Sequence, residues 1–147
     1  MIVDTSAWVE YSRRTESPFD IMLDEAVRDG RPIATPAPVV MELLVGCRTE
    51  VESVELLQLL SRFEILIPDS LRDYENAAGI YRTCRQAGFT IRSMIDCLVA
   101  ATALDKDRPL LARNRDFAVI ARYTGLELVI PPDTGPPKKP PRGWSGE

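Results

Sequence analysis

Short apolar runs alternate with helix-like segments along the first 130 residues of the chain. Runs of this length, bounded by proline, glycine or polar residues, are typical of buried strands. The segments between them place apolar residues three and four positions apart, as helices with one buried face do. Strands that alternate with helices pair in parallel through right-handed crossovers. The pattern therefore predicts an α/β fold, a three-layer α/β/α sandwich around a parallel sheet.

The predicted elements form one domain over residues 1–130. A chain of 147 residues with 45% apolar content can build one hydrophobic core but is too short for two ordinary domains. No internal repeat is found. The predicted strands are 1–3, 32–35, 64–67, 109–112 and 126–130, and the predicted helices are 5–11, 19–28, 36–46, 51–62, 70–88, 93–105 and 117–123.

The composition changes after residue 130. Six of the twelve prolines and three of the eight glycines fall within residues 131–147, where apolar residues are scarce. Such a segment cannot bury enough apolar surface to fold, so it is predicted to be a disordered tail. Lys138, Lys139 and Arg142 in this tail could contact an anionic partner, although a solvated tail without that role is the preferred interpretation.

Charge and residue content exclude several classes of function. The net charge of −4 argues against a broadly basic nucleic-acid-binding surface, while a local basic patch remains open. The chain has no histidine, so imidazole can serve neither as metal ligand nor as general base. No apolar run approaches the ~18 residues of a membrane span, and no basic leader precedes the first strand. We expect no membrane association and a cytoplasmic location.

The three cysteines are expected to be small buried hydrophobic residues. They are odd in number and lie in apolar, helix-like surroundings, which disfavours a disulfide framework or a zinc cluster. They are Cys47, Cys84 and Cys97.

Four acidic residues are predicted to meet at one edge of the sheet. In a parallel sheet, each helix starts near the carboxyl ends of the strands, where open α/β sheets bind their ligands. Asp4 ends the first strand, and Glu42 lies early in the helix after the second strand. Asp96 opens the helix that precedes the strand at 109–112, and Asp116 follows that strand. All four carboxylates should therefore lie at the same edge.

Each acid also has an alternative explanation. Asp4 or Asp116 could simply cap the helix that follows it. Asp96 completes a Ser93-x-x-Asp96 pattern, which is typical of a capping box. Glu42 fits such an explanation least, because its segment is apolar on nearly every helical face and an unpaired buried carboxylate is costly. Independent caps, however, give no reason for all four acids to share one edge.

The joint interpretation is a divalent-metal site. Two carboxylates ~4 Å apart repel by about 4 kcal/mol at an effective dielectric near 20, so four of them need a cation to remain ionised together. Ligands that are all oxygen indicate Mg²⁺ or Mn²⁺ rather than zinc. We expect Asp4, Asp96 and Asp116 to bind the metal, and these three with Glu42 to form the catalytic set. A metal at such an edge can activate water against a phosphodiester, which is hydrolytic nuclease chemistry.

The stretches that carry these acids resemble the successive motifs of PIN-domain ribonucleases, specifically the VapC toxins of toxin–antitoxin pairs. Each motif is weak alone, but four in register over residues 1–130 are specific. The resemblance implies a PIN-like nuclease domain with Mg²⁺- or Mn²⁺-dependent endoribonuclease activity on structured RNA such as tRNA or rRNA. It also implies a homodimer and a small cognate antitoxin that neutralises the enzyme and binds operator DNA. The four stretches are IVDTSAWVEY, PVVMELLVG, SMIDCLVAATAL and PLLARNRDFAVIA.

Carried over position by position, the resemblance assigns most of the acids. Asp4, Glu42 and Asp96 match the first three acids of the family. Ser6 matches a hydroxyl that supports the first acid or a substrate phosphate, although a helix cap would explain it nearly as well.

The sequence departs from the family at the fourth acid. Family members commonly read Thr-x-Asp-x-Asp-Phe after the last active-site strand, where this chain reads Ala-Arg-Asn-Arg-Asp-Phe over residues 112–117. Asn114 replaces the first of these aspartates and could still offer a neutral carbonyl oxygen. The site then loses one charge and depends on Asp116, so weaker metal binding is expected.

Three arginines flank the acidic motifs and should surround the mouth of the site. Guanidinium groups there could bind phosphates, and ordinary solvated loop arginines are an equally good explanation. They are Arg92, Arg113 and Arg115.

Two other classes of function compete with a nuclease. A phosphorylated receiver domain also places acids at a parallel-sheet edge, but it needs a lysine after the last strand, and none lies at 126–130. A catalytically weak PIN scaffold that binds RNA or protein stays open because of Asn114. Trp8, Tyr11 and Met41 are expected to lie in the core rather than in a partner groove.

Overall fold

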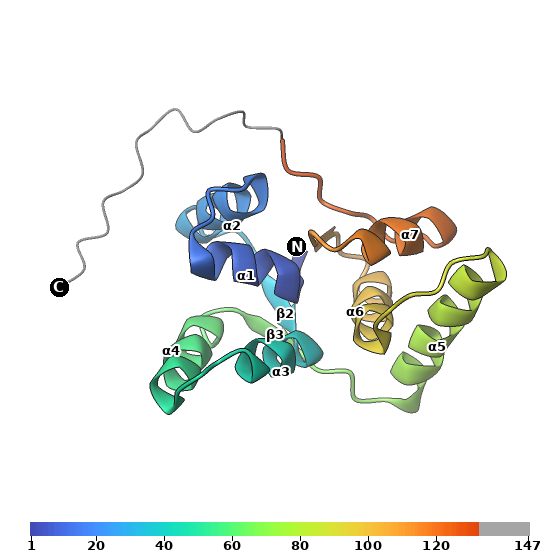
Figure 1. Cartoon of the computed structure of the whole chain (residues 1–147), viewed down its shortest axis with the longest axis horizontal. Helices are drawn as coiled ribbons and strands as arrows, with labels where there is room; N and C mark the ends of the chain where they lie inside the picture. The colour runs from blue at the N-terminus through green and yellow to red at the C-terminus, as the bar shows by residue number, and fades with distance from the viewer. Residues whose placement is uncertain (133–147) are drawn as a thin grey trace.

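The protein is built around a four-stranded parallel sheet, described here from a computed structural model that covers residues 1–132 (Figure 1). The strand order is β3-β2-β1-β4, with Ile2 of β1 paired to Ala34 of β2 on one side and to Leu110 of β4 on the other. The strands are β1 (Ile2–Val3), β2 (Ala34–Pro36), β3 (Glu64–Leu66) and β4 (Leu110–Leu111).

Seven helices connect and cover the strands of the described residues. In Figure 1, α1 and α2 lie together, α3 and α4 form a second pair, and α5, α6 and α7 form a third group. This arrangement confirms the predicted α/β class and the three-layer sandwich with a parallel sheet. The helices are α1 (Thr5–Arg13), α2 (Pro18–Arg28), α3 (Ala37–Val45), α4 (Glu50–Leu60), α5 (Leu71–Gln86), α6 (Met94–Asp105) and α7 (Arg115–Tyr123).

The strand order creates a switch point beside β1. The chain proceeds from β1 to β2 and β3 in one direction, then crosses through α5 and α6 to place β4 on the opposite side of β1. Open α/β sheets bind ligands outside the carboxyl ends of the strands at such a point. The residues that follow β1 and β4 therefore occupy the position where a ligand site is expected.

The centre of the sheet is fully buried. Ile2, Val3, Leu110 and Leu111 have no exposed surface, which is why these strands read as unbroken apolar pairs. Trp8 of α1 is also in the core, and its indole N–H donates to the Thr35 hydroxyl at 3.1 Å.

The residues expected to be buried do not all lie in the core. Cys84 and Cys97 are fully buried free thiols, and burial raises the pKa of Cys97 to about 11, as expected for inert core residues. Met41 of α3 is 52% exposed, so its assignment to the core was wrong. Only Val39 and Leu43 of α3 are buried, so the apolar residues around the rest of this helix, Met41 among them, remain partly or largely exposed.

The predicted last strand over 126–130 is reduced to a single bridge. Leu128 pairs with Leu110, and the Leu110 N–H donates to Glu127 O while the Val129 N–H donates to Leu110 O, both at 2.9 Å. Because β4 contributes only two residues, it offers few backbone partners to a further strand.

The boundary of the predicted tail lies at the end of what the structure describes. Residues 133–147 of the predicted disordered segment are outside the described residues. Among residues 1–132, no helix has the length and apolar character needed to cross a membrane.

Candidate active site at the carboxyl edge of the sheet

Asp4 lies at the centre of the edge, between the ends of β1 and β4. Its backbone N–H donates to Leu111 O at 3.0 Å, which ties the two strands together just before they end. Its Oδ2 accepts from the Ser6 N–H at 3.0 Å and from the Ser6 hydroxyl at 2.7 Å, so Asp4 does cap α1. Its Oδ1, in contrast, is buried without a hydrogen-bond partner. Capping thus explains one oxygen of this carboxylate and leaves the other unexplained.

Burial dominates the electrostatics of Asp4. The residue is 3% exposed, and burial raises the pKa of its carboxyl group, with the hydrogen bonds from Ser6 and from the Thr5 backbone opposing the shift only in part. A cation beside Oδ1 would reverse this penalty, because it would stabilise the ionised form.

Glu42 reaches the same edge from α3. Its side chain is half-buried, and its Oε1 accepts a hydrogen bond from the Thr5 hydroxyl at 2.8 Å. Thr5 follows Asp4 directly, so this contact brings the carboxylate of the second motif beside the first. The Thr5 hydroxyl thus gives Glu42 the hydrogen bond that a carboxylate in apolar surroundings requires.

Asp96 is the most perturbed acid of the edge. It is 5% exposed in the first turn of α6, and its Oδ2 accepts from the Asn114 side-chain amide at 2.7 Å. Burial, followed by the charges of Asp4, Glu42 and Asp116, raises the pKa of Asp96 to about 7. The other three acids are therefore close enough to Asp96 for their negative charges to disfavour its ionisation.

The capping-box explanation of Asp96 does not describe its contacts. Ser93 caps α6 by accepting from the Ile95 N–H at 3.2 Å, and the Asp96 carboxylate faces Asn114 instead.

Asn114, not Asp116, caps α7. The helix begins two residues earlier than predicted, at Arg115, because the Asn114 Oδ1 accepts from the Asp116 N–H at 3.0 Å. The alternative that Asp116 is a cap was wrong. This hydrogen bond also orients the amide, since its oxygen faces the helix and its nitrogen must then face Asp96. Asn114 presents a donor to the acids here, rather than the free carbonyl oxygen expected of it.

Asp116 is held by Arg92. Its Oδ2 accepts from the Arg92 backbone N–H at 3.1 Å and from the guanidinium Nε at 3.3 Å. The arginine side chain is 69% exposed, so this ion pair is open to solvent and weak. A ligand could displace it at little cost.

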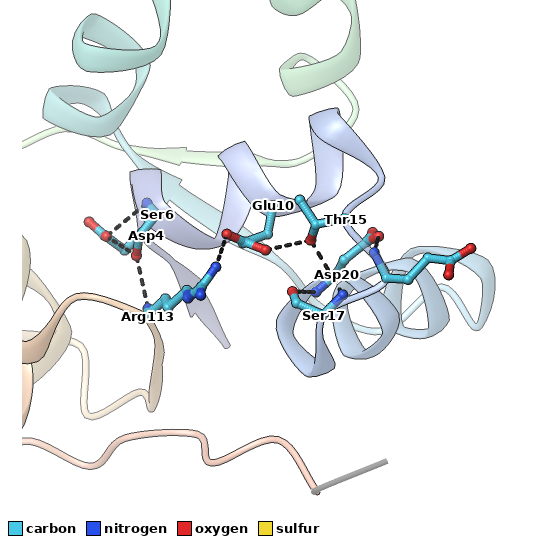
Figure 2. Close-up of polar contacts among 8 residues, drawn as sticks. Asp4, Ser6, Glu10, Thr15, Ser17, Asp20 and Arg113 are labelled. Carbon is cyan, nitrogen blue, oxygen red and sulfur yellow. Dashed lines mark hydrogen bonds and ion pairs between the residues drawn. The ribbon is translucent and has the colours of Figure 1, made fainter. Parts of the chain in front are cut away.

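The remaining predicted residues differ in their contacts. The Ser6 hydroxyl donates to Asp4, and it also accepts from the Arg113 N–H at 2.9 Å. The Arg113 guanidinium forms an ion pair with Glu10 of α1 (Figure 2). Arg115 is exposed, and its side chain forms no hydrogen bond or ion pair within residues 1–132.

Glu10 is a residue of this region that the sequence interpretation left out. The available signal was its place in α1, one helical turn after Ser6 and inside an otherwise apolar segment.

The chemistry of the edge suits a hard divalent cation, although the carboxylates do not yet surround a common point. Within residues 1–132, no three acidic or cysteine side chains stand in a geometry ready to hold a metal ion. One oxygen of each acid is held by a protein donor, and Oδ1 of Asp4 is buried without one. The donors present are all oxygen, as Mg²⁺ and Mn²⁺ prefer. Asp4, Glu42, Asp96 and Asp116 would hold such a cation only if their carboxylates came closer to one another than they are here.

Comparison with known proteins places the chain in a family. Residues 1–123 match the PIN domain family. Ribonuclease VapC11 of Mycobacterium tuberculosis (strain ATCC 25618 / H37Rv) is 40% identical over 134 residues, covering 88% of this chain and 97% of that protein. VapC ribonuclease Mb1587 of Mycobacterium bovis matches with the same identity and coverage.

Solved structures share the fold at lower identity. A chain in the crystal structure of VapBC2 from Rickettsia felis bound to a promoter DNA fragment superimposes with a TM-score of 0.69 at 22% identity, covering 87% of this chain and 96% of that chain. A chain in a toxin–antitoxin complex from Klebsiella pneumoniae gives 0.60 at 21% identity, covering 80% and 89%. The parallel-sheet fold agrees with these structures, and the family match and the 40% identical relatives show that the chain belongs to the PIN-domain family, among the VapC ribonucleases.

Proposed function

We propose that this protein is a toxin endoribonuclease that uses Mg²⁺ or Mn²⁺ to hydrolyse phosphodiester bonds in structured RNA such as tRNA or rRNA. The observation that carries the proposal is the group of four carboxylates around Asp96, whose pKa is raised to about 7 by burial and by the other three. Ionising these neighbouring, partly buried carboxylates together is unfavourable, and a bound divalent cation would offset that penalty.

In this proposal, Asp4, Asp96 and Asp116 hold the metal. When bound, the cation would lower the pKa of an attacking water and stabilise the charge of the leaving oxygen. Ser6 keeps Asp4 oriented through two hydrogen bonds, and Asn114 does the same for Asp96 through one. Glu42, which is half-buried and held by Thr5, stands beside the metal ligands as a base or a water-orienting group.

The matched structures support a protein partner for this chain. The matched structures are described as VapBC and toxin–antitoxin complexes, which supports a small cognate antitoxin for this chain as well. We further propose that the protein works in the cytoplasm as a homodimer.

The metal site is tested first by Asp4→Asn. Asparagine is as good a helix cap as aspartate, so α1 should persist while the charge beside the buried Oδ1 is lost. RNA cleavage should require Mg²⁺ or Mn²⁺, stop in EDTA and fall at least about a hundredfold in the variant. Asp29→Asn, at the opposite edge of the sheet before β2, is the matched control and should cut normally.

The assay separates the nuclease from its alternative. Cleavage by wild-type protein that persists in EDTA, or a wild-type rate in Asp4→Asn, would contradict a metal site built on Asp4. RNA binding without cleavage in either metal would instead favour a PIN scaffold that acts as a binding module.

A further inference from the structure

Glu10 is a nearly buried acid that belongs to no metal site. It is 8% exposed on α1, and its two oxygens are used differently. Oε1 pairs with the Arg113 guanidinium, and Oε2 accepts from the Thr15 hydroxyl, which lies just after the end of α1 (Figure 2). Burial alone would raise the pKa of Glu10, but hydrogen bonds from Thr15, Ser17 and Arg113 outweigh it and lower the pKa below its ordinary value. Glu10 is thus a fixed anion.

Arg113 is attached to α1 at two points. Its backbone N–H donates to the Ser6 hydroxyl, which itself donates to Asp4, and its side chain reaches Glu10. Ser6 and Glu10 are four residues apart, so the arginine side chain lies along about one turn of α1, ~6 Å in length. The backbone of Arg113 is therefore tied to Ser6 beside Asp4, while its guanidinium is held at Glu10, about one helical turn further along α1, as the dashed contacts in Figure 2 show.

The held guanidinium still has donors to offer. Arginine carries five N–H groups in a planar fork, and the ion pair with Glu10 is made through Nη1. The Arg113 side chain is 58% exposed, whereas the Glu10 side chain is only 10% exposed. The buried partner thus fixes the exposed one, and much of the Arg113 side chain remains open to solvent. This geometry suits bidentate capture of a phosphate.

We propose that Glu10 is a positioning residue that holds Arg113 to bind a backbone phosphate of the RNA beside the acidic edge. The inference rests on the proposed function, because it names how the same site takes its polyanionic substrate. The acids of the edge repel RNA, so a cation fixed next to them sets where the strand can approach.

The direction in which Glu10→Gln changes RNA affinity distinguishes a positioning role for Glu10 from a simple effect of its charge. Neutralising an acid near a polyanion site normally strengthens binding, because a repulsive charge is removed. Glu10→Gln should instead weaken binding of a short fluorescent single-stranded RNA about threefold, since Arg113 loses its anchor. Glu16→Gln, with the same charge change just beyond α1, is the matched control and should leave binding equal or slightly tighter. Binding is measured in EDTA, where the proposed enzyme cannot cut.

The salt dependence tests the phosphate contact itself. Arg113→Gln should weaken binding about tenfold and reduce the slope of log affinity against log salt by about 0.7, the value for one lost phosphate contact on a single strand. The exchange Glu10→Arg with Arg113→Glu restores an ion pair but places the anion outward. Compared with the single variants, this exchange should recover thermal stability but not RNA affinity. If the ion pair were only a structural tether, restoring it would recover both.

The outcomes separate this inference from the nuclease proposal. Tighter RNA binding in Glu10→Gln, an unchanged salt slope in Arg113→Gln, full rescue by the exchange, or no RNA binding by wild-type protein would each overturn the role of Glu10. If any of these occurs while metal-dependent cleavage persists, the proposed function stands. If Glu10→Gln fails to fold, the salt dependence of RNA binding by Arg113→Gln and Arg113→Lys tests the phosphate contact in its place. The lysine variant should keep the slope and lose affinity, because it retains the charge but not the fork.

Discussion

Asp96→Asn should lower RNA cleavage by about a thousandfold while making the metal-free protein more stable above about pH 7. Cleavage falls because the substitution removes one charge from the proposed metal ligands. Stability rises because the buried carboxylate no longer has to ionise among three other acids, while the asparagine oxygen can still accept from Asn114. Activity is measured with Mn²⁺, and stability is measured by urea unfolding in EDTA.

The pH dependence has a defined sign. The pKa of Asp96 is about 7 in the folded protein and about 4 in an unfolded chain, so the folded state binds more protons between these values. Wild-type stability therefore falls as pH rises from about 4 to about 7, and the full deficit is present above that. The upper limit of this deficit is about 4 kcal/mol for a shift of about three units. Asp4, whose pKa is also raised, acts in the same direction, so the difference between wild type and variant isolates Asp96.

Asp105→Asn is the matched control on the same helix. Asp105 ends α6 and forms an exposed ion pair with Lys106, so its loss should change neither cleavage nor the pH dependence. A lower melting temperature of Asp96→Asn in EDTA at every pH would contradict the electrostatic account and indicate that the carboxylate is needed for the fold.

Asn114→Asp should tighten Mn²⁺ binding about tenfold and destabilise the metal-free protein. The Asn114 amide donates to Asp96 at 2.7 Å, so the substitution places two carboxylates against each other where a hydrogen bond existed. Aspartate caps a helix as well as asparagine does, so the start of α7 should not change. The added charge favours the metal-bound state, and a gain of about 1.4 kcal/mol corresponds to the tenfold change. Calorimetric titration measures it.

A second substitution shows whether the new acid and Asp116 share one ion. Asp116→Ala should weaken Mn²⁺ binding severely in the natural protein and less in the Asn114→Asp background, because the introduced carboxylate can replace the missing one. Strictly additive effects would mean that the two positions act on different ions, or on none. Unchanged affinity in Asn114→Asp alone would place residue 114 outside the coordination sphere.

The fold was predictable because its pattern is local. Two-residue runs such as Ile2–Val3 and Leu110–Leu111 are fully buried, so they read as apolar on both faces and indicate a parallel sheet. The gathering of the acids then followed from topology alone, since helices leave a parallel sheet at one edge. No contact between particular side chains had to be known.

The rest depended on contacts that no local pattern contains. The orientation of Asn114 is decided by a backbone N–H of α7 on one side and by Asp96 on the other, 18 positions away. Glu10 pairs with Arg113 across 103 positions of the sequence, so no local pattern around either residue indicates the contact. The strand predicted at 126–130 is shortened to the bridge between Leu128 and Leu110, because its pairing depends on β4, which is a different segment of the chain.

The strand order also decides when the site can exist during synthesis. β1 pairs with β4, and Asp4 at one end of the chain must meet Asp96 and Asp116 near the other. A nascent chain that has emerged only through β3 holds Asp4 and Glu42 but has neither of the later acids. A chain still in synthesis therefore cannot bring together the four acids of the proposed nuclease site until α7 has left the exit tunnel.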